Sequence, residues 1–227
     1  MTLVAVVRFP GSNCDMDTVR AVQAAGSEAE LVWHRDSELG RADVVILPGG
    51  FAYGDYLRAG AIARFSPIMS AVLRHANSGG PVLGICNGFQ VLCEAGLLPG
   101  ALLRNAGQRF ISRPVTVRVE NTTTPFTTAY QQGDTLVVPV ANGEGRYVAP
   151  DDVLRRLEDE GRVVLRYLEN PNGSAQDIAA VANATGNVVG MMPHPERAVD
   201  RQAGLTDGLL VFESIASGAG LITGGTR

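Results

Sequence analysis

The sequence is poor in several residue types and patterns on which particular functions depend. It contains three cysteines, three histidines and one tryptophan in 227 residues, and no run of basic residues. A net charge of −4 and a pI near 5.4 disfavour nucleic acid or an anionic membrane as the main partner. The longest apolar runs are far shorter than a membrane span, and no basic leader precedes the first of them, so we expect neither a transmembrane helix nor a signal peptide.

The cysteines are odd in number and do not have the spacing of metal ligands. This usage favours the reducing cytoplasm over a disulfide framework, and we expect no metal site. Hydrophobic residues make up 45% of the chain, which is enough for a sizeable core. No composition break, repeat or low-complexity tract marks a boundary, so we expect a single domain over residues 1–227.

Buried-type apolar runs alternate with helix-compatible segments in the first hundred residues. The predicted strands cover residues 3–9, 29–33, 42–47 and 82–85, and the predicted helices cover residues 15–25, 66–76 and 89–95. This rhythm predicts an α/β protein of three layers, with a mostly parallel sheet and helices on both faces. Later segments are predicted as antiparallel or edge strands (102–119, 135–140), a strand (162–168), a hairpin (178–183 with 188–192), two helices (150–160, 206–216) and a loose tail from Gly218.

Some local expectations concern helix starts and single histidines. Asp15 is suited to cap the first helix, and Ser66 to cap the second, with Pro67 in its first position. His34 and His75 have no partner nearby in the sequence, which is typical of surface or capping residues.

The segment Gly84-Ile-Cys86-Asn-Gly88 lies between a predicted buried strand and a predicted helix. This is the thiol version of the turn that places a nucleophile at the tip of a sharp strand-to-helix connection. Cys86 would then face the amino end of the helix, where unpaired N–H groups and the helix dipole stabilise a thiolate. The alternative is a buried structural thiol, as most free cysteines are. We assign Cys93 to the core and leave the role of Cys14 open.

A histidine and a glutamate two residues apart follow the last predicted strand, in Pro193-His194-Pro195-Glu196. The proline rings are expected to prevent helix formation and to hold His194 in an extended conformation. In an extended segment the two side chains share a face, so Glu196 can orient the imidazole and leave its other nitrogen to accept a thiol proton. The alternative is a solvent-exposed turn with an incidental ion pair.

A glycine pair ends the third predicted strand, in Pro48-Gly49-Gly50-Phe51. Ligands bind at the carboxyl ends of strands in open α/β sheets, although a Gly-Gly pair alone is often an ordinary turn. A free N–H group of this turn, together with that of Asn87, would form an oxyanion hole for acyl-transfer chemistry. The residues alone therefore indicate a thiol hydrolase or acyltransferase, without naming its substrate.

The segment from Gly84 to Gln90, which contains this nucleophile elbow, and the segment His194-Pro-Glu196 together resemble the class I (triad) glutamine amidotransferases. Further blocks resemble the small glutaminase subunits of phosphoribosylformylglycinamidine synthases within that family: residues 9–15, 47–58, 65–67, 97–105 and 191–197. The resemblance covers nearly the whole chain and implies a flavodoxin-like topology. Asn142 stands at a position where many relatives have histidine, so we assign it no catalytic role.

The resemblance implies a role for each matching residue. Cys86 would attack the side-chain amide of L-glutamine, with His194 as base and then acid, and with Glu196 orienting it. The other positions implied are an oxyanion hole (Gly50, Asn87) and substrate-binding residues (Gly49, Phe51, Gly88, Gln90). A glutamyl thioester would form, and ammonia would leave.

The resemblance also implies partners. Ammonia would pass to a large ATP-using synthetase subunit, which converts formylglycinamide ribonucleotide to the amidine, and a small subunit would bridge the two. ATP and magnesium are expected on the synthetase and no cofactor in this chain, which has no phosphate-binding loop motif. Two alternatives are a cysteine hydrolase or peptidase of related fold and a non-catalytic regulatory subunit.

Overall fold

The computed structural model describes residues 1–200 and 204–218, so the tail predicted beyond Gly218 lies outside the described residues. Five strands form a parallel block: β1 (Leu3–Arg8), β2 (Glu28–Trp33), β3 (Val44–Leu47), β4 (Val82–Ile85) and β11 (Val188–Met191). Their order is β2-β1-β3-β4-β11, as in a doubly wound sheet. The strands β1, β3, β4 and β11 are rich in Val, Ile and Leu and are buried on both faces. This burial is typical of parallel strands that are covered by helices.

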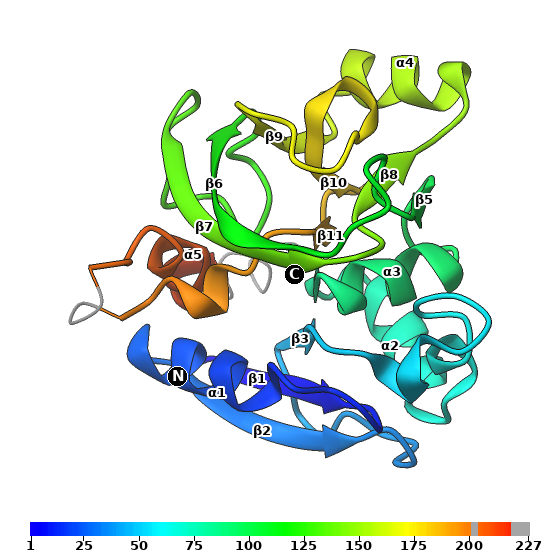
Figure 1. The fold of residues 1–227 in the computed structure, drawn as a ribbon. Helices are drawn as coiled ribbons and strands as arrows, with labels where there is room; N and C mark the ends of the chain where they lie inside the picture. Colours follow the sequence, from blue (N-terminus) through cyan, green and yellow to red (C-terminus); the bar gives the residue numbers. More distant parts are fainter. Residues whose placement is uncertain (201–203, 219–227) are drawn as a thin grey trace.

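Four antiparallel strands continue the same sheet beyond β11: β10 (Ile178–Ala182), β9 (Val163–Tyr167), β6 (Ile111–Val119) and β7 (Thr135–Asn142). Figure 1 shows this block curving above the parallel one, in green and yellow. The α/β class, with a mixed sheet, is therefore confirmed. The prediction of one strand over residues 102–119 is wrong, because β5 (Ala101–Leu103) pairs separately with β8 (Arg146–Val148).

The longer helices are α1 (Asp15–Ala24), α2 (Ile68–Asn77), α3 (Asn87–Glu94), α4 (Asp151–Asp159) and α5 (Leu209–Gly218). The chain runs from β1 through α1 to β2 in one direction along the sheet, and from β3 through α2 to β4 in the other. With right-handed crossovers, α1 and α2 then cover opposite faces. Short 3₁₀ turns are η1 (Ala52–Asp55), η2 (Ala63–Phe65), η3 (Ala175–Asp177) and η4 (Pro195–Arg197).

The pairing of β4 with β11 brings together two segments about a hundred residues apart. The strands are parallel and in register, with Ile85 opposite Met191. The N–H of Cys86 donates to the carbonyl of Met191 over 2.8 Å, which extends the pairing one step past β4. The residues that follow both strands therefore emerge side by side at the same edge of the sheet.

Several local predictions are wrong in detail. Asp15 is the first residue of α1 and pairs with Arg8 at 2.8 Å, whereas Cys14 occupies the cap position. No side-chain cap closes α2, because the Ser66 hydroxyl lies 2.9 Å from the Tyr53 hydroxyl instead. His34 is buried rather than on the surface, since its Nδ1 lies 2.7 Å from the same Tyr53 hydroxyl. Among the described residues, no helix is long and apolar enough to cross a membrane.

Candidate active site

Cys86 lies at the tip of the connection between β4 and α3. It has φ 50° and ψ −103°, a strained conformation for a residue with a side chain and the one expected at a nucleophile elbow. Gly88 makes this tight connection possible, because a Cβ atom there would lie 1.9 Å from the carbonyl oxygen of Leu47. The elbow therefore packs directly on β3, with Cys86 at the amino end of α3.

His194 and Glu196 follow β11 and form a buried pair. The imidazole Nδ1 lies 2.6 Å from Glu196 Oε1, and each residue is only 2% exposed. The backbone differs from the extended segment that we predict, since residues 195–197 form the 3₁₀ turn η4. A proline can occupy the first position of a helical turn, where its missing N–H group is not needed, so the turn starts at Pro195.

The surroundings of His194 make it a stronger base than an ordinary histidine. Burial alone would lower the pKa of His194, but the Glu196 carboxylate and the neighbouring Cys86 raise it well above its usual value. The Nε2 atom has no hydrogen-bond partner among the described residues. One nitrogen is thus held by Glu196, and the other remains available for a proton.

The glycine turn after β3 lies against the imidazole of His194. A Cβ atom on Gly49 would come within 2.7 Å of His194 Cε1, so only glycine leaves room for the imidazole. Gly50 bridges to Ser12, and Phe51 donates its N–H to the carbonyl of Gly11, so the preceding loop holds the turn in place. The N–H groups of Gly50 and Asn87 have no acceptor in the described part of the chain.

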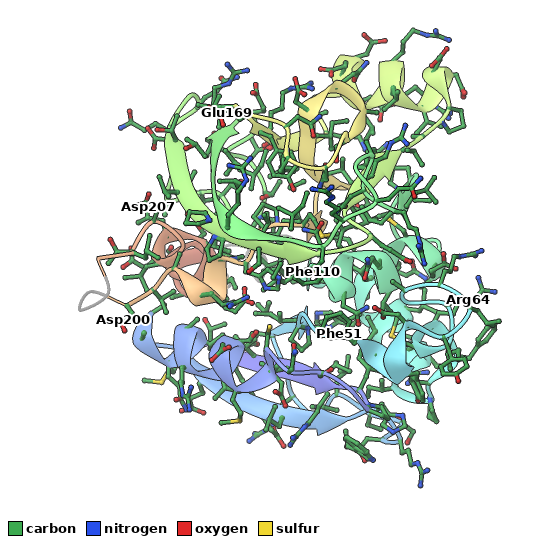
Figure 2. The ribbon with its side chains drawn as sticks, in the orientation of Figure 1. Phe51, Arg64, Phe110, Glu169, Asp200 and Asp207 are labelled. Carbon is green, nitrogen blue, oxygen red and sulfur yellow. The ribbon has the colours of Figure 1, made fainter. Side chains whose placement is uncertain are left out.

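Two adjoining cavities open at the thiol. One, of about 250 Å³, is lined by Cys86 and His194 together with Cys14, Gly50 and others; the second, of about 180 Å³, extends from Cys86 toward Gln90. Phe51 and Phe110 line both cavities. Figure 2 shows them at the centre of the molecule, on segments of the lower and the upper half. The two blocks of the sheet therefore contribute opposite walls.

The side chain of Asn87 connects two residues that line the second cavity, Asp55 and Gln90. Its oxygen accepts the N–H of Ala52 at 3.1 Å, and its nitrogen donates to Asp55 and to Gln90 Oε1 at 3.1 and 2.9 Å. Gln90 in turn donates to the carbonyl of Glu144 at 2.7 Å. This chain of hydrogen bonds joins α3 to η1 and to the segment after β7.

The structure thus places seven of the nine predicted site residues at or around these cavities: Cys86, His194, Glu196, Gly49, Gly50, Phe51 and Gln90. Asn87 lines neither cavity, but its side chain donates a hydrogen bond to Gln90, which lines the second one. Gly88 lines neither cavity and has the packing role described above.

Several residues of the cavity walls could not be identified from the sequence. Asp55, Phe110, Ala141 and Glu144 reach the cavity only through the long-range fold. Cys14, whose role the sequence leaves open, is buried beside the triad, and burial raises the pKa of its thiol. Donor atoms of Cys14, His194 and Glu196 lie within 4.8 Å of one another, a spacing that a metal ion could use.

A wider depression of about 490 Å³ lies elsewhere, along residues 30–40. It is open to solvent and is lined by neither cysteine nor histidine. The two cavities at Cys86, rather than this depression, are therefore the candidate site for the chemistry of the triad.

An elbow thiol with a buried imidazole–carboxylate pair, above a doubly wound sheet, defines a cysteine-dependent acyl-transfer enzyme of the triad amidotransferase class. Residues 2–204 match the model of the CobB/CobQ-like glutamine amidotransferase domain, and the chain belongs to this family.

Individual relatives show which members of this family the chain is similar to. The chain is 60% identical to phosphoribosylformylglycinamidine synthase subunit PurQ of Rubrobacter xylanophilus, over 95% of this chain and 98% of the relative. It is 58% identical to the subunit of the same name from Frankia casuarinae, over 95% and 93%. A solved structure of PurLQS from Thermotoga maritima contains a chain that is 47% identical, with a TM-score of 0.88 and coverage of 95% and 97%.

Proposed function

We infer that this chain is the glutaminase subunit of a phosphoribosylformylglycinamidine synthase and that it hydrolyses L-glutamine to glutamate and ammonia. The observation that carries this conclusion is the Cys86–His194–Glu196 arrangement in a chain 58–60% identical to two PurQ subunits. A non-catalytic regulatory role would require a missing triad member, and all three are in place.

The reaction proceeds through a thioester. His194 takes the proton of the Cys86 thiol, and the sulfur attacks the side-chain carbonyl carbon of glutamine. His194 then donates the proton to the departing nitrogen, which leaves as ammonia, and the glutamyl group stays on the sulfur. Water attacks this thioester with His194 again as base, and glutamate leaves. Glu196 stabilises the imidazolium that forms in each half of the cycle.

The N–H groups of Gly50 and Asn87 stabilise the oxyanion of the tetrahedral intermediates. Both belong to segments that converge on the thiol, and neither has an acceptor among the described residues. Loss of one such donor costs about 10²–10³ in rate in comparable sites. Gly49, Phe51 and Gln90 contact the substrate, and Gly88 lets the elbow reach it.

The ammonia is used by a partner. The relatives are named as subunits of phosphoribosylformylglycinamidine synthase, and the Thermotoga maritima structure is named PurLQS, which supports assembly with a large subunit and a small one. The large subunit uses ATP and magnesium to convert formylglycinamide ribonucleotide to the amidine. All three cysteines are free, which supports a function in the reducing cytoplasm.

Replacing Cys86 by Ala tests the function directly. In the complex reconstituted with its synthetase subunits, the variant should release no glutamate above background but should still make the amidine when ammonium salt is supplied. Cys93→Ala is the matched control, because that thiol lies seven residues after Cys86, lines neither cavity and contacts the carbonyl of Pro99 instead. Equal glutamate release by wild type and Cys86→Ala would remove Cys86 from the mechanism.

A further inference from the structure

We propose that the carboxylates of Asp55 and Glu144 bind the α-ammonium group of the glutamine substrate and so select a free amino acid over other carboxamides. This inference rests on the proposed function and assigns a role to two residues that are not among the predicted site residues and do not belong to the triad. Both residues line the 180 Å³ cavity that Cys86 also lines.

The two acids come from different parts of the fold. Asp55 ends η1, in a segment where Tyr53, Gly54 and Asp55 all have positive φ angles. Glu144 follows β7 by two residues. Each is half-buried, and they approach closely enough for Glu144 to act on the carboxyl of Asp55: burial, and then the nearby Glu144, raise the pKa of Asp55 to about 6.

The protein holds both carboxylates in place but does not neutralise them. Asn87 donates to Asp55 Oδ1 at 3.1 Å, and the N–H of Ala59 donates to Glu144 Oε2 at 3.4 Å. In the described part of the chain Glu144 forms an ion pair with Arg104, whose Nε lies 3.8 Å from Glu144 Oε1 and whose side chain is 80% exposed. An exposed pair of this kind contributes little, so the negative charge of the cavity remains uncompensated.

A positively charged ligand is what such a cavity lacks. When the side-chain amide of glutamine lies at Cys86, the opposite end of the molecule, with its ammonium group, extends along the same cavity toward the two acids. Charge-assisted hydrogen bonds to a carboxylate are about twice as strong as neutral ones. The buried amide of Asn142 lines the cavity too and has no partner among the described residues, a second sign that a polar ligand completes this site.

The test compares two substrates that differ only in the ammonium group: L-glutamine and glutaramate, which keeps the carboxamide and the carboxylate. In the reconstituted complex, Asp55→Asn should lower kcat/KM for glutamine about 10–100-fold, mainly through KM, because a hydrogen bond to a charged group is lost. The same change should leave kcat/KM for glutaramate within about twofold of wild type. Glu144→Gln should act in the same direction.

The choice of variants separates charge from structure. Asn at position 55 can still accept the hydrogen bond of Asn87, and Gln at position 144 can still accept that of Ala59. Asp159→Asn, which removes an exposed carboxylate on α4, is the matched control and should change neither substrate. An equal loss with glutamine and glutaramate, or no loss with either, would overturn the proposal.

A second measurement does not depend on turnover. In the full chain alone, Asp55→Asn should slow alkylation of Cys86 by 6-diazo-5-oxo-L-norleucine about tenfold or more, and should leave alkylation by iodoacetamide unchanged. If the wild-type complex released no ammonia from glutamine, the proposed function would fail, while the ratio of these two labelling rates would still decide the role of Asp55.

Discussion

At the scale of single residues, the catalytic pair depends on burial as much as on proximity. Glu196 and His194 are almost fully enclosed, and Oε2 of Glu196 has no partner among the described residues. A buried carboxylate is costly unless a positive charge compensates it, so Glu196 favours the protonated form of His194. The same interaction therefore raises the pKa of the base and fixes the ring that carries it.

Replacing Glu196 by Gln should separate these two effects. The amide can still hydrogen bond to the imidazole, but it no longer stabilises the imidazolium, so the pKa of His194 should fall. We expect kcat for glutamine hydrolysis to drop by roughly 10²–10⁴, as for the corresponding change in other triads. Steady-state kinetics and NMR titration of His194 would measure both; a normal rate with an unshifted titration would contradict the assigned role.

The pKa of Asp55 leads to a pH dependence of substrate binding. This carboxyl is ionised above about pH 6 and becomes protonated below it, when it can no longer compensate an ammonium group. Among the described charged groups, Glu144 raises the pKa of this carboxyl, and Glu144 itself pairs with Arg104. KM for glutamine should therefore rise as the pH falls through about 6. In Asp55→Asn, KM should change less with pH over the same range.

Sequence reasoning could find the triad because each member lies in a short pattern with its own chemical meaning. Cys86 lies between two glycines, and His194 lies two residues from Glu196. It could not find Asp55 or Glu144, since single acidic residues in loops are common and only the tertiary fold brings these two to one cavity. His34 shows the same limit: a partner nineteen residues away, Tyr53, buries it.

At the scale of elements, the elbow is limited by its contact with β3. A Cβ atom on Gly88 would overlap the carbonyl of Leu47, which belongs to the fully buried strand next to β4. The backbone at both positions is held by sheet and helix hydrogen bonds, so neither side can move away cheaply.

Gly88→Ala should therefore destabilise the protein by more than about 3 kcal/mol, the upper range for overpacking a well-packed core. Gly107→Ala is the matched control, because a Cβ atom there meets nothing within 4 Å and the residue does not have positive φ. Chemical denaturation of the two variants would measure the difference. Similar unfolding free energies would show that the elbow adjusts more easily than the structure implies.

The order of strands and helices in the first half of the chain could be predicted because hydrophobic runs and turn residues alternate there. The segment 102–119 could not, because its composition suits a strand throughout. A turn with Gln108 at φ 51° interrupts it, and pairing with β8 determines where β5 ends. The turn η4 cannot be predicted from its two prolines either, since proline is excluded from the interior of a helix but not from its first residue.

At the scale of the whole molecule, the site lies where the parallel and antiparallel blocks meet. Large aromatic side chains on both sides of this boundary remain partly exposed, with Phe51 at 46% and Phe110 at 56% (Figure 2). Both line the two cavities at Cys86, and a partner subunit that covered them would close the site against water.

Glutaminase turnover should accordingly depend on assembly. We expect the isolated chain to hydrolyse glutamine at least about tenfold more slowly than the complex with its synthetase subunits, because closure of the site is then missing. Glutamate release at equal concentrations of free and assembled chain is the measurement, with ammonium-dependent amidine formation as the control for an intact synthetase. Equal rates would exclude control by the partner.

The in-register pairing of β4 with β11 has a consequence for how the enzyme becomes active during synthesis. The thiol is made when less than half the chain has been translated, but its base arrives more than a hundred residues later, on the neighbouring strand. Until that last parallel strand docks, Cys86 is a reactive group without a partner. The rate at which a mild electrophile labels Cys86 during refolding would therefore measure how fast the sheet closes.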